Sequence, residues 1–144
     1  MEHIHATCIA VHGHGVILRG ASRSGKSDLA LRLVDEGAQL VADDLCRIDA
    51  RNGQLVAFPP DRLAGFLEVR GLGIVPVPSC GPVPVSLLCD LRAGGETERL
   101  PETDQVLLCS VPVRRVWIDP FRVSATAHDR LALRLATGEI IPVS

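Results

Sequence analysis

The sequence predicts an α/β fold built around one strand-loop-helix unit. The apolar run Val16–Leu18 leads into a glycine-containing loop, and the residues after this loop place apolar side chains at helical spacing. A second strand of the buried type, "QLVADD" over 39–44, follows the helix. The chain has 144 residues, of which 47% are hydrophobic and 22% charged, a composition typical of folded globular proteins. We therefore expect one domain over residues 1–144.

The elements around the loop have clear local signals. A helix is predicted over 26–37, because its leucines recur on one helical face and Gly37 is a typical helix stop. A β-hairpin is predicted over 45–58, since the pair Asn52-Gly53 favours the type I′ turn that joins two antiparallel strands.

The second half of the chain is expected to alternate between strands and loops. Residues 66–85 contain several glycines and prolines, and proline cannot donate to a central sheet ladder, so this segment is expected to follow the surface. Strands are predicted over 86–92 and within 105–118, on either side of the polar loop 93–104. A second helix is predicted over 125–138.

The loop after the first of these strands fits G-x-x-x-x-G-K-[ST], the P-loop pattern that cradles nucleotide phosphates. Between a strand and a helix, its backbone N–H groups and the positive end of the helix dipole converge on an anion. In such a loop the lysine contacts the β- and γ-phosphates, and the serine hydroxyl sits on Mg²⁺. The alternative is a glycine-rich turn whose lysine is solvated. The matching residues are Gly20, Ala21, Ser22, Arg23, Ser24, Gly25, Lys26 and Ser27.

Two carboxylates, Asp43 and Asp44, close the strand that follows the loop helix. In P-loop proteins a carboxylate at such a strand end holds the metal or its water. Two in succession favour a division of labour, with one for the metal and one for a proton. The alternative is a structural role in a turn or as a helix N-cap.

Charge and composition argue against several other classes of protein. The formal net charge is −2, and no Lys/Arg run exceeds the pair Arg114-Arg115, so nucleic acid is not expected as a partner. The five cysteines contain no C-x-x-C pair, which indicates buried thiols in a reducing compartment. No segment approaches the ~20 apolar residues of a membrane span, and the N-terminus lacks the pattern of a secretory signal. We expect a cytoplasmic protein without a membrane partner.

Three motifs, "GASRSGKS", "VADD" and "FLEVRGLGIV", together resemble the catalytic domain of the bacterial HPr kinase/phosphorylase family. The third is close to that family's signature L-E-[IV]-R-G-[LIV]-G, which general P-loop NTPases do not share. The likeness runs from about His5 to Leu100. It implies a P-loop core with a mixed sheet, similar to the nucleotide domain of phosphoenolpyruvate carboxykinase. It also implies a protein kinase that uses ATP and Mg²⁺ to phosphorylate a serine of HPr, the small phosphocarrier protein of the phosphotransferase sugar system, or of an HPr-like carrier.

The resemblance assigns the chemistry to particular residues. Lys26 matches the family's catalytic lysine, and Ser27 and Glu68 match its Mg²⁺ positions. Asp44 matches the proton acceptor of the kinase reaction, which acts as proton donor when inorganic phosphate removes the phosphoryl group by phosphorolysis. Asp43 is then the additional carboxylate for the metal.

Two further positions depend on the resemblance alone. His5 and Arg99 match an active-site histidine and an active-site arginine of the family. Without the resemblance, His5 would be interpreted as an exposed histidine and Arg99 as a solvated charge. Arg70, inside the signature segment, either orients a phosphate or pairs with Glu68 in a structural role.

The chain is expected to depart from the larger members of the family, without their N-terminal domain or their longer C-terminal helical region. It resembles a short single-domain form, and the segment used for dephosphorylation is not recognisable after Trp117. The family is usually hexameric, so a homo-oligomer is one assembly to expect. Two other functions stay open on the residues alone: a P-loop small-molecule kinase or NTPase, and a nucleotide-binding regulator with little catalysis.

Overall fold

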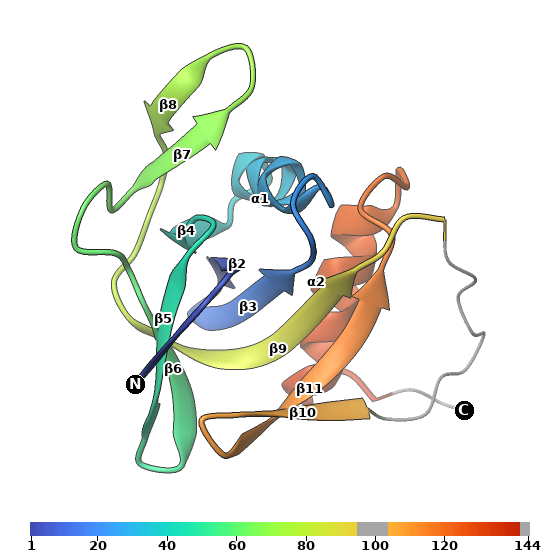
Figure 1. Cartoon of the computed structure of the whole chain (residues 1–144). Helices are drawn as coiled ribbons and strands as arrows, with labels where there is room; N and C mark the ends of the chain where they lie inside the picture. The colour runs from blue at the N-terminus through green and yellow to red at the C-terminus, as the bar shows by residue number, and fades with distance from the viewer. Residues whose placement is uncertain (95–103, 142–144) are drawn as a thin grey trace.

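The computed structural model describes residues 1–94 and 104–141. Within them a nine-stranded sheet runs in the order β1-β5-β6-β9-β3-β2-β4, and β11 pairs with β9 and carries β10 at its outer edge (Figure 1). The helices are α1 (Lys26–Asp35) and α2 (Ala125–Ala136). The strands are β1 (Glu2–Ile4), β2 (Ala6–Val11), β3 (His14–Arg19), β4 (Gln39–Ala42), β5 (Cys46–Arg51), β6 (Gln54–Phe58), β7 (Phe66–Val69), β8 (Gly73–Pro76), β9 (Val83–Leu91), β10 (Asp104–Leu108) and β11 (Val111–Ile118).

The sheet is mixed, which confirms the α/β class with a mixed sheet. Strands β3 and β9 pair in parallel, and so do β9 and β11, whereas β2 runs antiparallel to both β3 and β4. Because the parallel strands point the same way, their carboxyl ends meet at one edge of the sheet. The glycine-containing loop leaves β3 at this edge.

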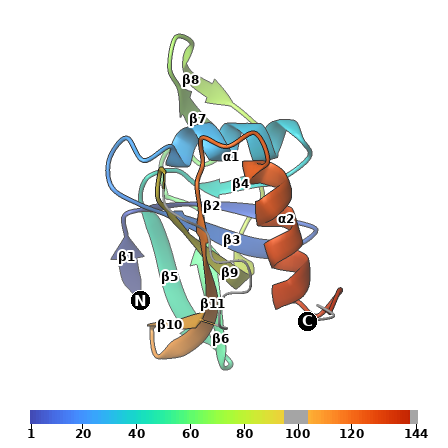
Figure 2. The same ribbon diagram turned by 90° about the vertical axis from the view of Figure 1, so that its right-hand side faces the viewer.

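Both helices cover the same face of the sheet (Figure 2). Leu29 and Leu33 of α1 and Leu133 of α2 pack in one core cluster with Val16 and Leu18 of β3. The intervening Ile17 packs in a second cluster on the opposite face. Strand β3 is therefore buried on both sides, so the loop that follows it starts from a fixed position.

Local signals located several elements correctly. The hairpin β5–β6 turns at Asn52 and Gly53, whose φ angles of 53° and 78° suit the expected type I′ turn. Helix α1 ends before Gly37, which has a φ of 112° and donates its N–H to the Val34 carbonyl at 3.0 Å. Such a left-handed residue after a helix favours glycine because a Cβ would be strained there.

The expectation that residues 66–85 follow the surface is confirmed for most of the segment and is wrong for its last three residues. Strands β7 and β8 form a separate antiparallel hairpin that projects from the body of the molecule (Figure 1). Residues 83–85 open β9, the strand that pairs with β3, β6 and β11. Pro84 is tolerated because it lies at the beginning of β9, where the ladder with β6 contains only Val83 and Pro84 on the β9 side.

The five cysteines were expected to be buried, and no segment was expected to span a membrane. Cys8, Cys46 and Cys89 are buried, as expected, whereas Cys80 and Cys109 are only half-buried, and all five are free thiols. Neither α1 nor α2, the helices of the described residues, is long and apolar enough to cross a membrane.

Candidate functional site

The glycine-containing loop joins the carboxyl end of β3 to the start of α1. Arg19, the last residue of β3, forms a two-point ion pair with Asp90 of β9, at 2.8 and 3.0 Å, which ties the entrance of the loop to the sheet. A Cβ added at Gly20 would lie 2.5 Å from Ser24 Oγ, so any other residue there would force Ser24 to shift. Gly25 has a φ of 96°, which a side chain would strain.

The loop presents the features of an anion site. Gly25 is the N-cap of α1, and no side chain caps this helix end. The first N–H groups of a helix have no partner within the helix, and the helix dipole places a partial positive charge at the same point. This arrangement fits a phosphate group.

The Lys26 side chain lies over the loop. Its ammonium donates hydrogen bonds to the carbonyls of Gly20 at 2.8 Å and Ala21 at 3.1 Å, and the residue is only 9% exposed. The alternative of a solvated lysine is therefore wrong. A positive charge held over the loop is suited to a bound polyphosphate.

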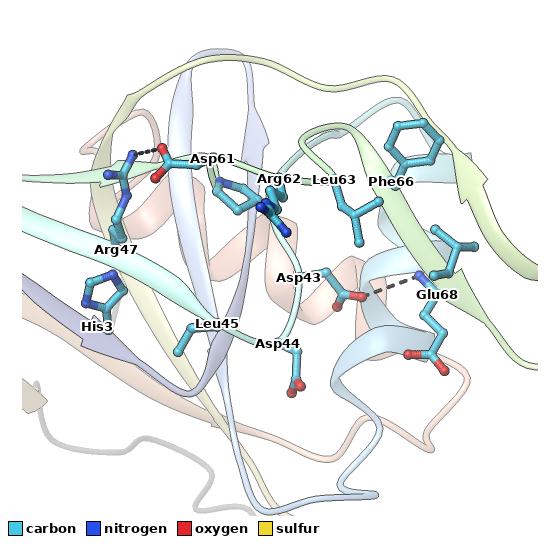
Figure 3. Close-up of a pocket in the computed structure, with 12 residues that line it drawn as sticks. His3, Asp43, Asp44, Leu45, Arg47, Asp61, Arg62, Leu63, Phe66 and Glu68 are labelled. Atoms are coloured by element: carbon cyan, nitrogen blue, oxygen red, sulfur yellow. Dashed lines mark hydrogen bonds and ion pairs between the residues drawn. The ribbon is translucent and has the colours of Figure 1, made fainter.

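Asp43 connects three elements around the start of α1. Its Oδ1 accepts hydrogen bonds from the Ser27 hydroxyl at 3.2 Å and from the Thr7 hydroxyl at 3.1 Å. Its Oδ2 accepts from the Glu68 N–H at 3.4 Å, which Figure 3 shows as the dashed line between β7 and the turn after β4. Asp43 therefore couples β2, α1 and β7.

Asp44 has a different geometry from Asp43. Strand β4 ends at Ala42, so both carboxylates lie in the turn after the strand and not within it. Asp44 has a φ of 66°. The residues on either side of it are joined by a hydrogen bond from the Leu45 N–H to the Asp43 carbonyl at 2.7 Å. The Asp44 carboxylate accepts no hydrogen bond from the described residues, and it points away from Asp43 (Figure 3). The Asp43 carboxylate is therefore held by three hydrogen bonds, whereas the Asp44 carboxylate accepts none from the described residues.

Thr7 was missed by the sequence analysis. Its side chain is completely buried in β2, where its hydroxyl donates to Asp43 and accepts the Asp44 N–H at 3.2 Å. It is the polar residue within the apolar run Ala6–Val11. A buried hydroxyl needs a hydrogen-bond partner, so a threonine in a fully apolar strand is the signal that could have found it.

These residues border two adjoining hollows that share Asp43, Asp44 and Glu68. The first is a cleft of about 570 Å³ above the loop. The second, of about 350 Å³, lies between the turn after β4 and the β7–β8 hairpin, and its wall is partly apolar (Figure 3). The cleft is lined by Ser22, Arg23, Gly25, Lys26, Ser27, Asp28, Leu31, Asp43, Asp44, Glu68, Val69, Arg70 and Phe121. The second hollow is lined by His3, Asp43, Asp44, Leu45, Arg47, Pro60, Asp61, Arg62, Leu63, Phe66, Glu68 and Ile74.

The donor set around the cleft fits a magnesium ion that is completed by phosphate. Within residues 1–94 and 104–141, no group of three or more His, Cys, Asp or Glu side chains could hold a metal ion by itself. Mg²⁺ is usually bound through one or two carboxylates together with substrate phosphates. Ser27, Asp43 and Glu68 supply a hydroxyl and two carboxylates beside the phosphate loop.

Three other positions complete the comparison with the sequence. His5 lies between β1 and β2 and lines neither hollow, whereas His3 lines the second one. Arg99 falls outside the described residues. Glu68 and Arg70 form no ion pair within the described part of the chain, so the structural pairing is wrong and both side chains remain available to the cleft.

Comparison with known proteins identifies similar chains. The family model described as "HPr Serine kinase C-terminal domain" matches residues 1–81. The chain is 45% identical over 76 residues to the HPr kinase/phosphorylase of Clostridium tetani. This alignment covers 53% of this chain and 25% of that protein. The chain is 33% identical over 124 residues to the HPr kinase/phosphorylase of Clostridium acetobutylicum, covering 78% of this chain and 41% of that protein. The chain thus spans well under half the length of these relatives.

A solved structure has the same fold. It is described as the Hpr(Ser) kinase/phosphatase from Coxiella burnetii, and it matches with a TM-score of 0.79 at 24% sequence identity. The match covers 93% of this chain and 99% of that one.

Proposed function

The chain belongs to the HPr serine kinase C-terminal domain family, and we propose that it transfers the γ-phosphoryl group of ATP to a serine of HPr or of an HPr-like phosphocarrier protein. Activity and partner are proposals, because the chain spans 25% and 41% of the two relatives.

One observation carries the proposal: the Ser27 hydroxyl and the Asp43 carboxylate meet at 3.2 Å, and Asp44 stands beside them with its carboxylate unengaged by the described residues. The same turn therefore offers a fixed carboxylate to a metal and a free carboxylate to a proton. A small-molecule kinase would also need these groups. The second hollow, which opens directly beside Asp44, favours a larger acceptor that covers the surface there.

The residues of the cleft have distinct proposed roles. The loop from Gly20 to Ser27 binds the phosphates of ATP through its N–H groups, and Lys26 stabilises negative charge on the β- and γ-phosphates. Ser27, Asp43 and Glu68 are the positions for Mg²⁺, which when bound neutralises charge on the transferred group. Two further roles rest on the resemblance to the family alone: Arg99 adds positive charge, and His5, which lines neither hollow, takes part in the active site.

The transfer step needs a proton acceptor. The hydroxyl of an acceptor serine is a weak nucleophile at neutral pH, so Asp44 takes its proton while the serine oxygen bonds to the γ-phosphorus and the bond to the β-phosphate oxygen breaks. ADP leaves and phosphoserine remains. In the reverse use of the site, an oxygen of inorganic phosphate bonds to the phosphoserine phosphorus while the bond from this phosphorus to the serine oxygen breaks. Protonated Asp44 gives its proton to the serine oxygen, and pyrophosphate leaves. We also propose that the nucleotide-binding core is similar to that of phosphoenolpyruvate carboxykinase, and that the protein is cytoplasmic.

The experiment that tests the proposal is transfer of radiolabel from [γ-³²P]ATP to purified HPr-like proteins, followed by mass mapping of the modified residue. We expect a single phosphoserine that depends on Mg²⁺, and none with the Lys26→Ala variant. Label transferred only to a small molecule, or released only as phosphate, would indicate the alternative kinase or NTPase. Tight ATP binding with no turnover would indicate the regulator.

A further inference from the structure

An exposed aromatic ring stands at the rim of the phosphate cleft. Phe121 is 63% exposed and lines the cleft together with the loop. A Cβ added at Gly25 would lie 3.4 Å from Phe121 Cζ and 3.0 Å from Pro120 Cγ, so the ring lies directly against the phosphate loop.

Hydrogen bonds of Asp119 and Arg32 hold the backbone of the turn that carries this ring. The Asp119 carboxylate accepts hydrogen bonds from the Phe121 N–H at 3.0 Å and from the Gly94 N–H at 3.1 Å. These bonds lower the pKa of the Asp119 carboxyl, so it stays ionised and bonded at neutral pH. The Arg32 guanidinium of α1 donates to the carbonyls of Pro120 and Arg122.

This bracing does not serve the burial of Phe121. Its neighbour Pro120 is buried against the loop, whereas the aromatic ring is left in contact with water at the mouth of the cleft. An exposed apolar ring gains little from the hydrophobic effect, and polar contacts from α1 and from residue 94 hold its backbone. The apolar side chains Leu31 and Val69 also line the cleft.

We propose that Phe121 is the platform on which the base of the bound nucleotide stacks. The inference rests on the nucleotide site of the proposed function and deepens it, because the loop accounts for the phosphates only. A nucleobase has a flat π-face, and stacking on an aromatic side chain is a strong contact that tolerates different bases. A ring fixed beside the phosphate loop is suited to such a contact, since little motion is lost on binding.

Direct binding measurements test this inference without the kinase reaction. Titration calorimetry would compare ATP with inorganic tripolyphosphate, which offers the same phosphates without a base. We expect Phe121→Ala to weaken ATP binding by about 5- to 150-fold, the range found when a base-stacking aromatic is removed, and to leave tripolyphosphate binding unchanged. The control is Val123→Ala, since Val123 is fully exposed two residues away and lines neither hollow.

A second variant keeps the ring and gives an optical signal. Phe121→Trp should retain ATP binding, and its added fluorescence should be quenched by ATP and not by tripolyphosphate. Wild type, whose single tryptophan is Trp117, supplies the background signal.

Several results would overturn the inference. Equal weakening of ATP and tripolyphosphate by Phe121→Ala would mean that the ring only shapes the loop, and no change in either would mean that the base binds elsewhere. Wild type that binds tripolyphosphate and ATP with equal affinity has no base site, and wild type that binds neither has no nucleotide site. If ATP binding depends on Phe121 while no HPr-like protein is phosphorylated, the inference holds and the proposed acceptor is wrong.

Discussion

The Thr7 hydroxyl donates a hydrogen bond to Asp43 Oδ1 at 3.1 Å and, with its lone pairs, accepts the Asp44 N–H at 3.2 Å. One buried side chain of β2 thus sets the positions of two successive carboxylates. Asp43 Oδ1 also accepts from Ser27, so the contact links β2 to the start of α1. Thr7 touches neither phosphate nor acceptor in the proposed reaction, and its expected effect is on the position of Asp43 and Asp44.

The first prediction concerns this contact. Thr7→Val keeps the shape and the strand preference of the side chain but removes the hydroxyl. We expect phosphoryl transfer to fall by about 10- to 100-fold, the usual effect of removing an outer partner of a metal ligand, and the Mg²⁺ requirement to rise. The control is Thr126→Val, a second buried threonine, which bonds to Glu36 at 3.1 Å away from the cleft. Equal losses in both variants would point to a general effect on stability.

The second prediction concerns Glu68. Glu68→Gln keeps the size of the side chain and removes the charge that a hard cation prefers. We expect the Mg²⁺ concentration for half-maximal transfer to rise by about tenfold or more, since even outer-shell contacts contribute 10- to 100-fold to metal affinity. The control is Glu139→Gln, since Glu139 is exposed just after the end of α2, pairs with Arg134 and lines neither hollow. An unaltered Mg²⁺ titration would remove Glu68 from the metal site.

Much of the fold could be predicted from local sequence signals. The turn at Asn52-Gly53 and the helix stop at Gly37 depend on the backbone angles of a few adjacent residues, which the amino-acid types largely determine. The strand-loop-helix order around Gly20 to Ser27 follows from the spacing of nearby apolar residues, which is also a local signal.

Other features depend on partners that are distant in sequence. Pro84, the second residue of β9, stands opposite Val56 of β6, a pairing that the proline itself does not reveal. The different settings of Asp43 and Asp44 depend on Thr7, 36 residues before Asp43. The position of Phe121 depends on Asp119 in the same turn and on Arg32 of α1. Such contacts form only when the tertiary structure brings the segments together.

The third prediction concerns a buried carboxyl group away from the cleft. Asp129 of α2 is fully buried, its Oδ2 accepts the Cys89 thiol at 3.5 Å, and its Oδ1 has no partner within the described residues. Burial raises the pKa of this carboxyl from 3.8 to about 7. Between about pH 4 and pH 7 the unfolded chain therefore loses this proton while the folded chain keeps it. The free energy of unfolding should fall as the pH rises through this window.

Asp129→Asn tests this pH dependence, because the amide stays neutral throughout. From pH 5 to pH 8 the stability of the variant should improve relative to wild type by on the order of 2 kcal/mol, measured by urea unfolding. Asp35→Asn, an exposed residue at the end of α1, controls for the loss of one charge. Parallel pH profiles for wild type and Asp129→Asn would show that Asp129 titrates normally.

The fourth prediction concerns the backbone of Asp44. Its φ of 66° lies in the left-handed region, where a side chain is strained and glycine is not. Asp44→Gly and Asp44→Ala both remove the carboxylate and should both lose transfer. Asp44→Gly should nevertheless unfold at higher urea than Asp44→Ala, by about 1 kcal/mol in free energy. Equal stability of the two variants would mean that the turn stores no strain.

The fifth prediction separates proton transfer from metal binding at the two successive aspartates. Asp44→Asn fills the same space, and asparagine also tolerates the left-handed backbone, so Mg-ATP binding should persist while transfer falls by the roughly 10²- to 10⁴-fold expected for loss of a general base. Asp43→Asn disturbs the contacts with Ser27 and Thr7, so it should weaken Mg-ATP binding as well. Calorimetry and single-turnover transfer distinguish the two effects. Phosphorolysis of the phosphoserine carrier, measured with inorganic phosphate, should fall in parallel with transfer in Asp44→Asn, because one group must serve both directions. Transfer at the wild-type rate in Asp44→Asn, or a loss of transfer confined to Asp43→Asn, would reverse the roles assigned to these residues.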